Sequence, residues 1–132
     1  MVENRKVNPW TWQDGFGFSQ AIETSGHKRV LRCAGQTPTN ADGAPMHAGD
    51  MAAQMALALD NVETVLRKAD MTLANIVRLN LYTTDVDAFL QHWEPIAGRL
   101  AAAGIQPAMT LLGVTRLFEP EVMVEMEADA VA

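Results

Sequence analysis

The stretch that decides the fold is Pro107–Ala132, PAMTLLGVTRLFEPEVMVEMEADAVA. Two apolar segments flank residues 116–121, which include three charged residues and a proline, and this pattern predicts two strands joined by a turn. Because side chains two residues apart on a strand point to the same side, Glu125 and Glu127 share one face of the second strand, and the apolar residues between them share the other. The sequence therefore predicts a closing hairpin whose last strand has one apolar face and one acidic face.

The composition predicts a single domain over residues 1–132. A chain of 132 residues with 48% hydrophobic residues can bury one core and is too short for two ordinary domains. The formal net charge is -6, and no run of basic residues is longer than Lys28-Arg29. Nucleic-acid binding is disfavoured, since this charge repels a phosphate backbone.

Cys33 is the only cysteine, so an internal disulfide is excluded. It lies in an apolar run, which favours a buried small hydrophobic residue over a reactive thiol. The first residues, MVENRKVNPW, contain no apolar segment that resembles a secretory signal or a membrane span. We therefore expect a cytoplasmic protein without membrane association.

The first half of the chain predicts a hairpin followed by a long loop. Residues 1–14 are interpreted as an ordered surface segment anchored by Trp10 and Trp12. Apolar and polar residues alternate over residues 16–24, and residues 29–34 contain an apolar run, so each segment is predicted to be a strand. The turn at 25–28 between them predicts that the two strands pair. Residues 37–49 are rich in Thr, Pro, Asn, Asp and Gly and predict a loop.

Two helices and one strand follow. Apolar residues at spacings of three and four after Asp50, a good N-cap, predict a helix over residues 51–68 whose apolar stripe packs in the core. Residues 76–83 alternate as a strand, with Val77 among the residues of its apolar face. A capping box at Thr84 and Asp87 predicts a second helix ending near residue 104, with a kink near 91–95 caused by Pro95.

This order predicts an α+β fold with two helices on one face of a mixed sheet. The other face of the sheet carries Glu125 and Glu127 among apolar residues, so it needs a second protein layer. Identical subunits are the simplest way to supply that layer.

Seven short motifs in one register over residues 16–131 carry a resemblance to a known family. They are Ala34–Pro38, Asp50 with Ala53-Gln54, Leu59–Val62, Tyr82–Val86, Pro107-Ala108, Val114–Leu117 and Val124–Ala128. Together they resemble the RidA family, also called YjgF. The resemblance implies a chorismate-mutase-like fold, assembled as a homotrimer with inward-facing sheets and small-molecule clefts between subunits.

The resemblance also implies a site. Active members of the family hydrolyse enamines and imines to 2-keto acids and ammonia, with a glutamate that handles the water and an arginine that binds the substrate carboxylate through two hydrogen bonds. The glutamate corresponds to Glu125, and Gly35 and Gln36 stand where the family has them. The arginine position is occupied by Met109. Three further polar positions of the family, a tyrosine, a serine and an asparagine, correspond to Phe18, Ala34 and Trp93.

These replacements predict an apolar chamber with one carboxylate. A buried substrate carboxylate without its cation would cost roughly several kcal/mol, so deamination of 2-aminoacrylate-type substrates is disfavoured. Our hypothesis is that Glu125 has a raised pKa and acts as a general acid and base or hydrogen-bonds an apolar ligand. The alternative is a structural carboxylate, which is the favoured interpretation for Glu127.

Arg116 and Arg32 are the cations that could replace the missing arginine as a ligand anchor, although a solvated or inter-subunit ion pair is the more common role for such residues. The three histidines and Cys33 share no metal-ligand spacing, and no Gly-rich phosphate loop or hydrolase elbow is present. We expect no metal and no cofactor.

The sequence leaves three candidate functions. The first is a hydrolase of enamine-like or imine-like compounds with an apolar pocket, and the second is a trimer that binds an apolar metabolite without turnover. Ribonuclease activity, reported for some relatives, is the least favoured because of the negative charge.

Overall fold

The central strand of the molecule is β6, at the end of the segment quoted above. A computed structural model describes residues 1–132. Its elements are β1 (Glu3–Val7), η1 (Trp12–Phe16), β2 (Ala21–Ser25), β3 (Val30–Arg32), α1 (Met51–Lys68), η2 (Leu73–Asn75), β4 (Ile76–Thr83), α2 (Val86–Gln91), α3 (Trp93–Ala102), β5 (Ala108–Gly113) and β6 (Val124–Val131).

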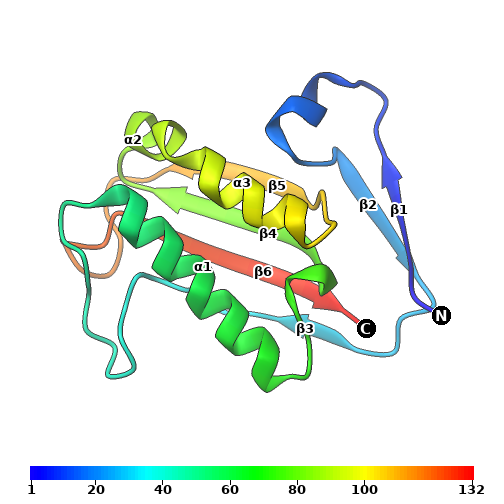
Figure 1. The fold of residues 1–132 in the computed structure, drawn as a ribbon, viewed down its shortest axis with the longest axis horizontal. Coiled ribbons are helices and arrows are strands. Elements are labelled where there is room, and N and C mark those ends of the chain that lie inside the picture. The colour runs from blue at the N-terminus through cyan, green and yellow to red at the C-terminus, as the bar shows by residue number, and fades with distance from the viewer.

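The main sheet has four strands in the order β3-β6-β4-β5, and the three α-helices lie on one of its faces (Figure 1). Strand β6 pairs antiparallel with β3 and β4, whereas β4 and β5 are parallel and are connected through α2 and α3. Strands β1 and β2 form a separate two-stranded sheet beside the first (Figure 1). This arrangement confirms a mixed α+β fold and leaves one face of the main sheet without helices.

Both predicted hairpins are wrong. Strand β2 pairs with β1 instead of β3. Strands β5 and β6 are not neighbours, because β4 lies between them. The connection over residues 114–123 is long enough to pass the end of β4, so its turn residues do not enforce a tight hairpin.

The first helix is confirmed. The Asp50 side chain caps α1 by accepting a hydrogen bond from the Ala53 backbone N–H at 3.0 Å. Its apolar stripe packs over β6, and Met55, Leu59 and Val62 are fully buried. The long hydrophobic periodicity and the capping residue agree, which explains why this element was predictable.

The second predicted helix is two helices. Helix α2 begins after Asp85, whose side chain accepts from the Ala88 backbone N–H, so the N-cap is not Thr84. Helix α2 ends at Gln91, with His92 as its C-cap, and α3 begins at Trp93 with Pro95 in its first turn, where a missing backbone N–H costs little. The break falls within the predicted kink region, and the sheet is covered by three helices instead of two.

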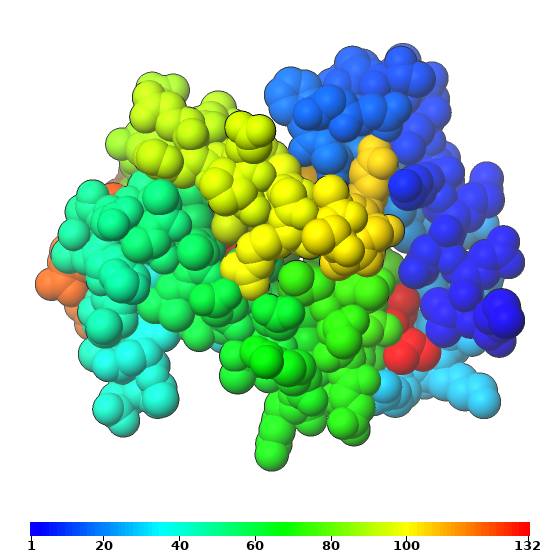
Figure 2. Space-filling model, in the orientation of Figure 1, coloured from blue at the N-terminus to red at the C-terminus, as the bar shows by residue number.

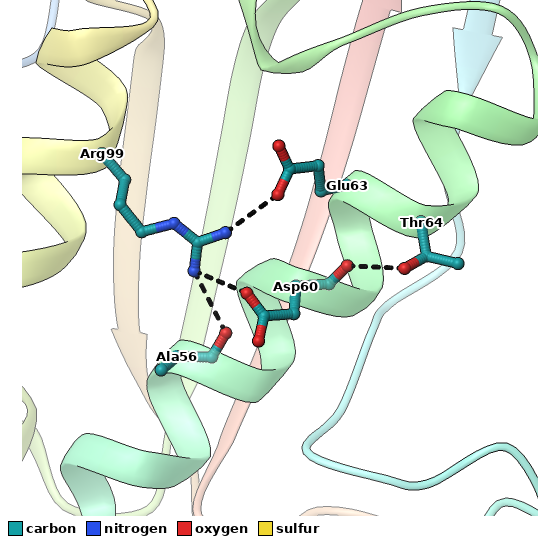
Figure 3. Close-up of polar contacts among 5 residues, drawn as sticks. All are labelled: Ala56, Asp60, Glu63, Thr64 and Arg99. Carbon is teal, nitrogen blue, oxygen red and sulfur yellow. Dashed lines mark hydrogen bonds and ion pairs between the residues drawn. The ribbon is translucent and has the colours of Figure 1, made fainter.

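Two polar side chains tie the helices to their surroundings. Gln54, fully buried on α1, donates to the backbone oxygen of Glu121 at 2.7 Å and accepts from the backbone N–H of Met123 at 2.9 Å, so it fixes the segment that leads into β6. Arg99 on α3 reaches across to α1, where it pairs with Asp60 at 2.9 Å and with Glu63 at 3.1 Å (Figure 3).

The alternation predicted for β6 is confirmed. Val124, Met126, Ala128 and Ala130 are buried under the helices, whereas the acidic residues between them are only partly buried on the opposite face. In β4 a register irregularity between residues 76 and 78 leaves Val77 half-buried, outside the predicted apolar face.

Residues 1–14 are ordered, and Trp12 contacts Phe16 and Phe18 edge-on, but neither tryptophan of this segment is buried. Trp10 and Trp12 are 58% and 59% exposed, and the buried residue of this region is Gln13. No helix of the protein is long and apolar enough to cross a membrane.

Candidate functional site

A polar cluster on the helix-free face of the sheet consists of Asn80, Tyr82 and Glu127. The antiparallel register places Asn80 opposite Glu127 and Tyr82 opposite Glu125. One carboxylate oxygen of Glu127, Oε1, accepts from Asn80 Nδ2 at 3.0 Å and from the Tyr82 hydroxyl at 2.5 Å. The hydrogen bond that Tyr82 donates to Glu127 is the main cause that raises the pKa of that phenol.

Glu125 has no such donors. It lies beside Gly35, whose segment is attached to β6 by the pair of backbone hydrogen bonds between Gln36 and Met126, at 2.6 and 2.9 Å. Burial, and secondly the negative charge of Glu127, raises the pKa of Glu125 above its ordinary value. The raised pKa predicted for this residue therefore has a structural cause, and a carboxyl group with a raised pKa is a candidate general acid and base.

Ala34 and Gln36 flank the same carboxylate along the chain. Ala34 is exposed, and its backbone oxygen accepts from the Gln36 side-chain nitrogen at 3.2 Å. The backbone pairing of Gln36 with Met126 in β6 thus brings Gly35 and Gln36 next to Glu125, and Ala34 precedes them in the chain.

A cavity of about 190 Å³ lies on the other face of the sheet, between the helices and the segment over residues 16–18. Every side chain that lines it is apolar: Phe16, Phe18, Leu81, Phe89, Leu90, Trp93, Met109 and Leu111. In Figure 2 a hollow separates the surface of α2 and α3 from that of the N-terminal segment. Three of the residues predicted to line a ligand site, Phe18, Trp93 and Met109, are therefore neighbours in one cavity.

The predicted site residues thus form two groups on opposite faces of the sheet. Met109 is paired with Leu79, a core residue under the helices, whereas Glu125 is paired with Tyr82 on the helix-free face. Side chains paired in register point to the same side, so within one chain Met109 and Glu125 point away from each other.

Neither candidate cation forms an ion pair with Glu125 or Glu127 within the chain. Arg116 is exposed in the connection between β5 and β6 and makes no ion pair or side-chain hydrogen bond within the chain. Arg32 pairs with Asp129 at 3.5 Å and is largely exposed. No group of three His, Cys, Asp or Glu side chains could hold a metal ion.

Sequence reasoning missed five of the cavity residues, namely Phe16, Leu81, Phe89, Leu90 and Leu111. Phe89 and Leu81 belong to apolar patterns that usually indicate core packing, and both are indeed nearly fully buried. Leu90 is 53% exposed, but a single exposed leucine is ordinary on a protein surface, so the sequence carried no signal that marks it as part of a cavity.

The family model described as endoribonuclease L-PSP matches residues 15–132. The chain belongs to this family, which includes the Rid and YjgF proteins. A Rid protein named YyfB from Yersinia pestis, whose function is unknown, is 35% identical, with 98% of each chain covered and a TM-score of 0.88.

More distant Rid/YjgF relatives are also similar over most of the chain. The YjgF gene product from E. coli is 27% identical, with a TM-score of 0.70 and coverage of 86% of this chain and 87% of that chain. A RutC family protein from Pyrococcus abyssi is 28% identical over 113 residues, which is 86% of this chain and 84% of that protein. The chorismate-mutase-like α+β fold expected for a Rid/YjgF protein is therefore confirmed.

Proposed function

We propose that this Rid/YjgF protein binds small, uncharged, mainly apolar molecules and hydrolyses neutral imines or enamines among them. The observation that carries the proposal is the cavity lined only by apolar side chains, with Met109 at the position of the family's arginine. A carboxylate placed there would lose its hydration without gaining a cation, at a cost of roughly several kcal/mol, whereas a neutral ligand would pay no such penalty.

Glu125 is the proposed acid and base. Its protonated form donates a proton to the imine nitrogen, which makes the imine carbon electrophilic, and its carboxylate then accepts a proton from the attacking water. The resulting carbinolamine loses ammonia or an amine and leaves a carbonyl compound. The raised pKa of Glu125 favours the first step, because it makes the protonated form more available at a given pH than in an ordinary carboxyl group.

A second copy must bring Glu125 to the cavity, since the two lie on opposite faces within one chain. Two features of the helix-free face favour such an assembly, for which we propose a homotrimer. Leu112, on the same face as Tyr82, is 49% exposed, and the buried side-chain oxygen of Asn80 has no hydrogen-bond partner within the chain. Multi-angle light scattering of the wild type and of L112E tests the assembly, and a wild-type monomer would contradict it.

Imine hydrolysis is tested with two substrate sets formed in the assay. An amine oxidase supplies neutral imines from primary amines, and an amino acid oxidase supplies imines that carry a carboxylate. We expect faster release of ammonia from the neutral set only, and a loss of about a hundredfold in E125Q. Equal or greater acceleration with the carboxylate set would contradict the proposal.

The second candidate function is binding without turnover. It is favoured by the separation of Glu125 from the cavity within one chain, and it would be supported if the protein binds neutral ligands while wild type and E125Q leave imine decay unchanged. Ribonuclease activity, which the name of the family model carries, is disfavoured because the net charge of -6 repels RNA.

A further inference from the structure

The walls of the cavity are rich in aromatic rings that hold one another in place. Phe89 and Trp93 stack with ring centroids 5.5 Å apart and an interplanar angle of 26°. Phe18 is contacted edge-on by Trp12, at 5.8 Å and 73°. Rings fixed in this way present pre-arranged faces and edges to a ligand. An aromatic ligand therefore gains more binding free energy from them than an aliphatic ligand of the same size.

The volume limits the ligand. The cavity measures about 190 Å³. A dry apolar cavity of about 150 Å³ is known to hold benzene, so there is room for one ring and a short substituent.

The polar part of the ligand must face outwards. The only polar group on a lining side chain is the indole N–H of Trp93, and it donates to the backbone oxygen of Phe16 at 3.4 Å. Phe16 and Leu90 are 57% and 53% exposed, which marks the open side of the cavity. A ligand therefore places its apolar end against Met109 and Leu111 and its polar group at the mouth.

We infer that this cavity binds the ring of a neutral, monocyclic aromatic molecule, with the polar substituent at the mouth between Phe16 and Leu90. The inference rests on the proposed function and narrows its substrate class to imines that carry an aryl group. It depends on the aromatic walls and the volume, in addition to the absence of charge.

Binding is measured by NMR on protein with ¹³C-labelled methionine methyl groups. The probes are benzyl alcohol, cyclohexylmethanol, which has a similar shape but no aromatic ring, and benzoate, which has the ring and a charge. Benzyl alcohol should move the Met109 methyl signal upfield through its ring current and bind about two- to twelvefold more tightly than cyclohexylmethanol. Met71, which is buried in the core away from the cavity, supplies the internal reference signal and should not move.

Two variants separate the contributions. F18L removes one ring but keeps the cavity apolar, so it should reduce the preference for benzyl alcohol over cyclohexylmethanol. M109R places a cation in the cavity and should bind benzoate more tightly than the wild type does; because this variant lacks the Met109 methyl probe, its affinity is compared with that of the wild type by isothermal titration calorimetry. An unchanged Met71 signal shows that each variant is folded, and a variant that moves it is replaced by F18I or M109K.

Three results would overturn the inference: equal affinity for benzyl alcohol and cyclohexylmethanol, equal binding of benzoate by the wild type, or no shift at Met109 because a neighbouring copy fills the cavity. These results differ from a failure of the proposed function. Hydrolysis of neutral aliphatic imines without aryl preference would refute only the inference, and aryl binding without any hydrolysis would refute only the enzyme activity.

Discussion

Glu125 lies directly against Gly35: a β-carbon added to Gly35 would stand 2.6 Å from both the carboxyl carbon and Oε1 of Glu125. Because the clash involves the end of a flexible side chain, G35A should displace the carboxyl group at little cost in stability. The expected result is a large loss of imine hydrolysis with an almost unchanged urea midpoint. Wild-type activity in G35A would show that the position of the Glu125 carboxyl group does not matter.

Gly98 provides the matched control for that substitution. It lies inside α3, and an added β-carbon would meet nothing within 4 Å. G98A should stabilise the protein by about 0.5–1 kcal/mol through helix propensity and leave activity unchanged.

Glu125 should also shape the pH dependence of stability. The folded protein raises its pKa, so the native state holds this proton more tightly than the unfolded chain, and stability is lost as the pH rises from the unfolded value of 4.5 through the raised one. Urea denaturation of E125Q should therefore show a gain over the wild type that grows above about pH 4 and then levels off.

Glu23 gives a control with the opposite sign. Its hydrogen bond and ion pair with Arg5 lower the pKa of Glu23, so its contribution to stability is present at higher pH and is lost as the pH falls through the lowered value. E23Q should lose stability relative to the wild type at neutral pH and not at strongly acidic pH. A constant difference between E125Q and the wild type at all pH values would contradict the raised pKa.

Gln54 should be among the most sensitive polar residues for stability. Q54M keeps the size but leaves the Met123 N–H and the carbonyl oxygens of Met46, His47 and Glu121 without this partner. We expect a loss of about 1–3 kcal/mol in urea denaturation, together with faster hydrogen exchange at Met123. M55L, at the adjacent buried position, should cost less than about 1.5 kcal/mol. Similar losses in the two variants would mean that volume, and not hydrogen bonding, matters at Gln54.

Arg99 tests the attachment of α3 to α1. Its side chain is 31% exposed, and its guanidinium contacts Asp60, Glu63 and the backbone oxygen of Ala56 (Figure 3). R99A should lower the unfolding free energy by about 1–2 kcal/mol, since a partly buried network is worth more than a single exposed pair. R5A, which breaks the exposed pair with Glu23, should cost less, and the reverse order would contradict this interpretation.

Much of the fold could be predicted because some local signals were strong. The stripe and the Asp50 cap defined α1, and the alternation in β6 placed Glu125 and Glu127 on one face. Strand β1 was missed because its residues, ENRKV, are mostly exposed on both sides and show no apolar alternation. The partners of β2 and β6 could not be predicted, since pairing depends on distant strands and not on the turn that follows.

The candidate site could be predicted only in part, for a related reason. Alternation shows which residues share a face within one strand, but it does not show whether Met109 in β5 and Glu125 in β6 face the same side. That depends on the register of both strands with β4. The residues to which the resemblance points lie on two opposite faces of the sheet in the single chain.

The position of β6 in the sheet has a consequence for how the chain folds. This strand is the last to be synthesised, yet it separates β3 from β4, and Val30 pairs with Val131 near the opposite end of the sequence. The sheet therefore cannot close by local zippering and must wait for a contact of very long sequence separation, which is expected to make folding slow. Until β6 arrives, the apolar side of α1 has no strand to cover it, so the nascent chain is at its most vulnerable to aggregation just before synthesis of this domain ends.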